Sequence, residues 1–219
     1  MDRADTFVAR LRGAVVLANG FPLLSGVDLE LERGSLSVLV GANGAGKTSL
    51  LRLLAGLHAL SDGSGTVLGL DLRGGDRRLL RRRVGWLGHE GSFYDDLSVE
   101  ENLTFAARAL ERPLDGLEPA LERVGLLARR HITTRQLSAG QRRRLGLAWL
   151  LLRRPELWLL DEPYASLDDE GRVFFDDLLA DVVAQGATVV VSAHDPLRSA
   201  ALHPRTLHVA GGRIVGRDA

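Results

Sequence analysis

Alternating apolar and polar residues indicate the first strands of the chain. The alternation covers residues 7–11 and 27–31, and residues 36–40 form a continuous apolar run that ends at a glycine. Leucines at helical spacing follow in residues 48–57, so a strand, a glycine-rich turn and a helix stand directly after one another. This succession is typical of a phosphate-binding helix start.

Helical patterns replace strand patterns in the middle of the chain. Residues 61–75 are rich in turn-forming residues around one short strand, and residues 84–87 predict a further strand. Ser98 and Glu101 form a capping box that opens a helix, and residues 119–127 begin another helical segment. We therefore expect a helical insertion between two α/β parts.

The alternation of helices and strands resumes in the last third of the chain. Its predicted elements are a helix at 141–152, a strand at 157–160, a helix at 169–184, a strand at 188–192 and a hairpin within 206–216. Such alternation predicts a mostly parallel sheet that is covered on both faces. Ligands bind at the carboxyl ends of the strands in sheets of this kind.

Composition narrows the class of protein. With 219 residues, of which 45% are hydrophobic, the chain is long enough for one domain with a buried core. It has no cysteine, which excludes disulfides, thiolate metal sites and cysteine nucleophiles. No apolar stretch approaches the roughly 18–20 residues that cross a bilayer, and the N-terminus lacks the apolar centre of a secretory signal. We therefore expect a cytosolic domain that does not itself span the membrane.

Charge gives no indication of a nucleic-acid partner. The 28 basic and 28 acidic residues balance to a net charge of zero, so no overall field attracts nucleic acid. Basic runs at residues 77–83 and 142–144 are typical of solvated faces. Arginine supplies all the basic residues except one, Lys47.

This single lysine closes a glycine-rich loop. Residues 41–48 match the pattern G-x-x-x-x-G-K-[ST] between the predicted strand and helix, a context that disfavours an accidental glycine turn. Glycines let backbone amides face phosphate oxygens, Lys47 reaches the outer phosphates, and the Thr48 hydroxyl can ligate magnesium. We expect the ATP phosphates to be bound by Gly41, Asn43, Gly44, Ala45, Gly46, Lys47, Thr48 and Ser49.

A second candidate group stands at the end of the apolar strand 157–160. Asp161 and Glu162 follow it directly, and two carboxylates at such a place are costly to bury without charged partners. Alone, this pattern is often an ordinary strand end. Together with the phosphate loop it predicts that Asp161 holds magnesium and that Glu162 polarises the attacking water.

Residues 137–141, with the sequence LSAGQ, resemble the signature sequence LSGGQ of ATP-binding-cassette (ABC) proteins. The resemblance covers nearly the whole chain, and the family motifs occur in family order. It implies a P-loop NTPase fold of the ABC type, a single domain over residues 1–219, with an antiparallel β part beside the mostly parallel core. Residues 1–90 and 136–219 would form the core and about 91–135 the helical subdomain.

The resemblance also implies an ATP site shared by two subunits. Ser138, Ala139, Gly140 and Gln141 would contact ATP held by the opposite subunit, although this segment alone reads as an ordinary capped helix. The D-loop would comprise Ser166, Leu167 and Asp168, and His194 would be the switch histidine beside the γ-phosphate. Only one cassette is present, so a second nucleotide-binding subunit is implied, most simply an identical chain.

Two positions depart from the family pattern. His89 stands where the family has its Q-loop glutamine, either as a substitute for it or as a surface histidine. A neutral imidazole can accept a proton from metal-bound water, but it titrates near neutral pH. The aromatic residue that stacks on adenine is missing near residues 17–19, and Phe21 is the nearest candidate, so GTP is a possible second substrate.

With these departures, the chain resembles the ATP-binding subunits of the haem exporters of cytochrome c biogenesis. The resemblance implies a peripheral subunit on the cytoplasmic side of a bacterial membrane, bound to separate transmembrane permease subunits and using ATP and Mg²⁺. Phe93, Tyr94 and Leu97 offer either a docking patch or a buried core patch. The alternatives are an exporter for a drug or lipid, a soluble ABC ATPase outside transport, or a cassette that binds ATP without hydrolysing it.

Overall fold

The fold was analysed in a computed structural model of the 219-residue chain. It describes residues 6–88, 93–165, 167–194 and 204–218. The chain divides into two compact units. The first comprises Met1–Trp86 and Glu156–Ala219, and the second comprises Leu87–Pro155.

A six-stranded sheet forms the centre of the first unit. Its inner strands pair in parallel, and three of them are buried at every position: β3 (Leu36–Val40), β8 (Thr188–Ala193) and β7 (Leu157–Asp161). This confirms the strands expected from the continuous apolar runs. The strand order is β10 (Arg213–Asp218), β9 (Arg205–Ala210), β3 (Leu36–Val40), β8 (Thr188–Ala193), β7 (Leu157–Asp161) and β6 (Val84–Leu87).

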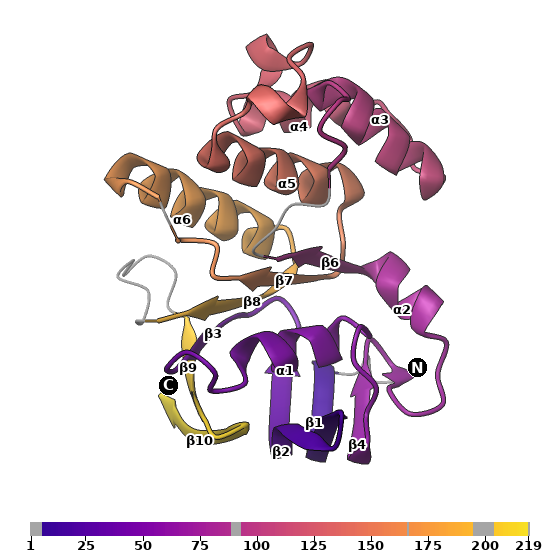
Figure 1. The fold of residues 1–219 in the computed structure, drawn as a ribbon, viewed down its shortest axis with the longest axis vertical. Coiled ribbons are helices and arrows are strands. Elements are labelled where there is room, and N and C mark those ends of the chain that lie inside the picture. The colour runs from indigo at the N-terminus through magenta and orange to yellow at the C-terminus, as the bar shows by residue number, and fades with distance from the viewer. Residues whose placement is uncertain (1–5, 89–92, 166, 195–203, 219) are drawn as a thin grey trace. The chain divides into compact units, whose positions relative to one another are not determined.

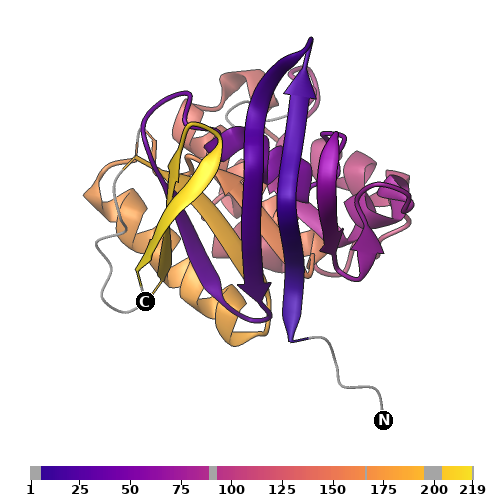
Figure 2. The same ribbon diagram turned by 90° about the horizontal axis from the view of Figure 1, so that it is seen from below.

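The first unit also contains a four-stranded antiparallel sheet. Its strand order is β2 (Phe21–Glu32), β1 (Phe7–Ala18), β4 (Asp62–Val67) and β5 (Leu70–Asp71). Figure 2 shows β1 and β2 as long neighbouring strands. Each has 12 residues, far more than the alternating segments predicted. Two strands, not one, also lie in residues 61–75, where a Cβ on Gly63 would stand 2.2 Å from the Gly13 carbonyl oxygen. The glycines permit this close strand pairing.

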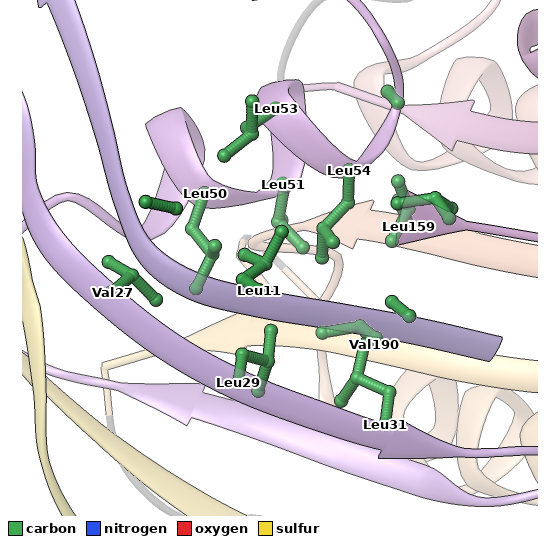
Figure 3. Packing of buried hydrophobic residues seen from close by; sticks show 14 of the residues in the cluster. Leu11, Val27, Leu29, Leu31, Leu50, Leu51, Leu53, Leu54, Leu159 and Val190 are labelled. Atoms are coloured by element: carbon green, nitrogen blue, oxygen red, sulfur yellow. The ribbon is translucent and has the colours of Figure 1, made fainter. Parts of the chain in front are cut away.

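Helix α1 (Lys47–Leu54) lies between the two sheets. Its four leucines at positions 50, 51, 53 and 54 are fully buried, and Figure 3 shows them near Leu11, Leu29, Leu159 and Val190 of the strands. Each buried leucine contributes about 1.5–3 kcal/mol. This packing fixes the N-terminus of α1 at the carboxyl end of β3.

Helix α6 (Asp169–Ala184) lies on the face of the six-stranded sheet opposite α1 (Figure 1). The basic run forms a helix that the charge pattern did not predict, α2 (Arg77–Arg83), capped by the Asp76 carboxylate. Arg83 at its end donates to Glu156 at 2.6 and 2.9 Å, and this hydrogen bond lowers the pKa of Glu156. The pair fixes the residue that precedes β7.

The second unit is helical. The capping box of Ser98 and Glu101 is present and opens the first helix, as predicted. Asn102 donates from its amide to the Tyr94 and Leu97 carbonyl oxygens and so holds the loop before that helix. Every helix in the described part of the chain is too short or too polar to cross a membrane. The helices are α3 (Val99–Ala109), α4 (Leu117–Arg123) and α5 (Ala139–Arg153), with 3-10 turns at Leu127–Arg129 and Thr134–Gln136.

Candidate functional site

The loop between β3 and α1 surrounds a cavity of about 440 Å³ in the first unit. Gly44 and Gly46 take left-handed backbone conformations, with φ of 76° and 111°. A Cβ on Gly41 would stand 2.2 Å from the Val209 carbonyl oxygen, so this position also requires glycine. The cavity is lined by Pro22, Leu23, Ser25, Ala42, Asn43, Gly44, Ala45, Gly46, Lys47, Thr48, Ser49, Glu162, Gly211 and Gly212.

Lys47 is the first residue of α1 and is only 5% exposed. Its ammonium group donates to the carbonyl oxygens of Gly41 and Ala42 at 2.6 and 3.2 Å and lies 3.9 Å from a Glu162 carboxylate oxygen. A buried cation is costly unless such partners surround it. The loop therefore holds a positive charge at the cavity wall, together with the positive end of the α1 dipole.

Thr48 and Asp161, the two residues expected to hold magnesium, meet beside the lysine. The Thr48 hydroxyl lies 3.0 and 2.9 Å from the two carboxylate oxygens of Asp161, which is 6% exposed. Mg²⁺ prefers a site of one or two carboxylates with hydroxyl, water and phosphate oxygens. The oxygen donors of this pair, next to a phosphate loop, fit that ion.

Glu162 directs a carboxylate into the same cavity. Its φ is 48°, a left-handed conformation that costs a non-glycine residue about 1–3 kcal/mol. Strain of this size persists where the surrounding structure enforces it, often at functional sites. His194 follows β8, and its Nε2 lies 3.6 Å from a carboxylate oxygen of Glu162. The structure thus brings together Lys47, Thr48, Asp161, Glu162 and His194.

Tyr164 fastens the segment after Glu162 to α6. Its hydroxyl donates to the Asp176 carboxylate at 2.5 Å, and its ring packs edge-to-face on Phe175. Burial raises the pKa of Tyr164, and the Asp176 hydrogen bond raises it further, so the hydroxyl stays protonated.

Asp168 of the predicted D-loop caps α6 by accepting a hydrogen bond from the Gly171 amide, and Leu167 precedes Asp168. Ser166 and His89 lie outside the described residues.

The predicted signature segment begins α5 in the second unit. Ser138 caps the helix, and its capping box with Gln141 is complete, with hydrogen bonds of 3.0 and 3.2 Å. Ser138 and Ala139 are exposed, a Cβ on Gly140 would meet no atom within 4 Å, and the first turn carries no acidic residue. The helix therefore presents free space and a positive end to an anion.

Gly212 joins the C-terminal hairpin to the phosphate loop, a contact that the sequence pattern did not reveal. Its amide donates to the Ala45 carbonyl oxygen at 2.8 Å, and its carbonyl accepts from the Ser25 amide at 2.9 Å. A Cβ here would stand 2.9 Å from the Leu23 carbonyl oxygen. Neighbouring Gly211 also has a positive φ, but its Cβ would meet nothing within 4 Å.

We expect Gly212→Ala to weaken ATP binding about tenfold, because the hairpin must move and the loop amides move with it. Gly69→Ala is the matched control, since it adds the same methyl group at a similar positive φ in open space and Gly69 does not line the cavity, so its affinity should stay near that of the wild type. Titration of a fluorescent ATP analogue measures both. Equal affinities for the two variants would contradict this role of the hairpin.

Comparison with known proteins agrees with this geometry. A profile described as ABC transporter matches residues 24–165, which is more than half of the chain. The chain belongs to the ABC transporter family. Its phosphate loop and the Asp161–Glu162 pair lie within the matched range.

Relatives and solved structures extend the match to the whole cassette. The cytochrome c biogenesis ATP-binding export protein CcmA of Nitrobacter winogradskyi is 41% identical over 200 residues, covering 91% of this chain and 96% of that protein. CcmA of Cupriavidus necator is 43% identical over 193 residues, which cover 87% of this chain and 85% of that protein. The solved structure of an ATP-binding subunit of an ABC transporter has a TM-score of 0.88 at 22% identity, and the match covers 97% of this chain and 90% of that one. The solved structure of CbiO1 of Clostridium perfringens has a TM-score of 0.84 at 24% identity, and the match covers 97% of this chain and 88% of that one. The fold is therefore that of ABC ATPases.

Sequence reasoning missed three features of the site. These are the left-handed backbone at Glu162, the Gly212 contact and the buried Ser192, whose hydroxyl lies between Asp161 and Glu162. A serine directly after three valines in the strand 188–193 was the one available signal, because a buried hydroxyl requires hydrogen-bond partners. Leu17 and Phe21, near the expected adenine position, are 49% and 75% exposed.

Proposed function

We propose that this chain is the ATP-hydrolysing subunit of an ABC exporter that serves cytochrome c biogenesis, with haem as its cargo. One observation carries the ATPase part of the proposal. Lys47, Thr48 and Glu162 line one cavity at the carboxyl ends of β3 and β7, where phosphates, a metal ion and a general base are needed together.

Each residue has a distinct task in this proposal. Lys47 and the amides of the loop bind the outer phosphates of ATP, and Thr48 and Asp161 hold magnesium. Magnesium, when bound, offsets charge that develops on the phosphate oxygens. Glu162 orients the attacking water and accepts its proton. His194, beside the Glu162 carboxylate, contacts the γ-phosphate.

A second copy of this chain completes each site. The start of α5 offers an exposed serine, open space at Gly140 and a helix N-terminus without acidic residues, which together suit a γ-phosphate. In the ABC resemblance this segment serves the nucleotide of the opposite subunit. Two copies related by twofold symmetry would then enclose two ATP molecules.

The chain binds separate permease subunits at the cytoplasmic face of the membrane. An exposed aromatic pair in the second unit supports such docking. Tyr94 and Phe105 are 57% and 52% exposed, and their rings meet edge-to-face at 5.2 Å. With Asp95, Asp96 and Leu97 they line a cavity of about 370 Å³.

Purification of the tagged chain from membranes of its native host tests the docking. We expect membrane proteins to co-purify, and expect the double variant Tyr94→Ala with Phe105→Ala to lose them while it still binds ATP. Leu114→Ala, which truncates another partly exposed apolar residue of the same unit, is the matched control. Recovery with ribosomes or DNA alone would contradict a transport role.

Removal of the gene from the host tests the cargo. If the chain drives haem export, c-type cytochromes with covalently attached haem should disappear, while other haem proteins persist. The wild-type gene should restore them, and the Lys47→Ala gene should not. Normal c-type cytochromes in the deletion strain would favour an exporter for another cargo, such as a drug or a lipid.

A further inference from the structure

Ser192 is a fully buried serine near the end of β8, two residues before His194. The strand pairs with β7 so that Ser192 stands opposite Asp161. Its neighbours in β8 are the apolar residues of the core. A hydroxyl in such surroundings is costly unless both its donor and its acceptor capacity are used.

The Ser192 hydroxyl uses both. It donates to the Asp161 carboxylate at 2.7 Å and accepts from the Glu162 backbone amide at 2.9 Å. One side chain therefore connects the carboxylate that faces Thr48 with the main chain of the residue that follows.

The first of these bonds restricts the Asp161 carboxylate. The oxygen that accepts from Ser192 also lies 3.0 Å from the Thr48 hydroxyl, and the other oxygen lies 2.9 Å from it. Rotation of the carboxylate would break the Ser192 bond. The serine thus fixes the rotation of the carboxylate while both of its oxygens face Thr48, and it does so from a fully buried position.

The second bond restricts the backbone at Glu162. That residue has a φ of 48°, and the direction of its amide depends on the peptide that joins it to Asp161. With the amide bound to Ser192, this peptide is fixed at the point where the chain leaves β7. The start of the Glu162 side chain is fixed with it.

We propose that Ser192 is a positioning residue that holds Asp161 and Glu162 in register with each other, so that metal binding and the general base act on the same phosphate. The inference rests on the proposed ATPase function. Ser192 acts only through these two neighbours and does not touch the nucleotide. Positions of this kind can change metal affinity or activity about tenfold or more.

Two readouts separate this role from a merely structural one. Phosphate binding without metal depends on Lys47 and the loop amides, so Ser192→Ala should bind a fluorescent ATP analogue normally in EDTA. The gain in affinity on adding Mg²⁺ should fall several-fold, because Asp161 is no longer held. In steady-state hydrolysis, kcat should fall about tenfold with little change in the KM for ATP.

Matched variants isolate the hydroxyl. Ser37→Ala removes another buried serine hydroxyl from the same sheet and should leave both readouts near wild type. Thr and Val have nearly the same shape, so Ser192→Thr should retain most of the Mg²⁺ response and Ser192→Val should lose it. Impairment of Ser192→Ala, Ser192→Thr and Ser192→Val together, with Ser37→Ala normal, would still support the proposal, because the alanine variant adds no volume.

A Ser192→Ala protein with the Mg²⁺ response and kcat of the wild type would overturn the proposal, and so would equal losses in Ser192→Ala and Ser37→Ala. Failure of the proposed function gives a different result. In that case the wild type itself would show no ATP turnover, while the Mg²⁺ dependence of nucleotide binding would still decide whether Ser192 positions Asp161.

Discussion

Replacing Lys47 with alanine is expected to lower ATP turnover by about a hundredfold or more. The ammonium group is buried at the cavity wall and bound by two loop carbonyls, so it is already held where the outer phosphates arrive. Lys47 is also the only lysine, and no second lysine can take over its role. Release of inorganic phosphate under saturating Mg²⁺ measures the effect.

Arg52→Ala is the control for this variant. Arg52 lies on the same helix and carries the same charge, but it is exposed and does not line the cavity. Its turnover should stay within about twofold of the wild type, because surface substitutions of this kind are usually small in effect. Comparable ATP turnover in Lys47→Ala and the wild type would contradict a role of the phosphate loop in hydrolysis.

Replacing Glu162 with glutamine is expected to slow hydrolysis by a factor on the order of a hundred or more while ATP still binds. The amide has nearly the shape of the carboxylate but cannot accept the proton of the attacking water. The phosphate-binding groups, Lys47 and Thr48, are unchanged. Single-turnover hydrolysis and nucleotide titration, carried out on the same preparation, separate the two effects.

Glu170→Gln makes the same chemical change at an exposed position in the first turn of α6. It should hydrolyse ATP at close to the wild-type rate. If Glu162→Gln also hydrolysed ATP at that rate, the general base would have to lie elsewhere, and the strained backbone at Glu162 would need another explanation.

The continuous apolar runs predicted the central strands well, because a parallel sheet covered on both faces demands apolar residues at every position. The long β1–β2 hairpin was predicted only in part. Gly13 and Gly26 interrupt the alternation, and register shifts near Leu11 and Ala14 change which residues face inward. The Asn19-Gly20 turn, with φ of 50° and 81°, was the local signal that these strands continue to a tight hairpin.

Motif spacing predicted which residues gather at the cavity, since strand ends of a parallel sheet meet at one edge. It could not predict how they are held. The left-handed backbone at Glu162 and the contacts of Ser192 and Gly212 depend on strand register and on segments far apart in the chain. Such contacts arise only from the tertiary structure, so single-sequence patterns do not contain them.

We propose that two copies of this chain close around ATP, with Ser138 and Gly140 of one copy facing the phosphates bound by Lys47 of the other. The most direct test is the mass of Glu162→Gln in solution by light scattering, with and without ATP and Mg²⁺. We expect a dimer of twice the 23.7 kDa chain mass with ATP, and a monomer without it or when Ser138→Arg is added. A variant that binds ATP and remains a monomer at every concentration would contradict the claim.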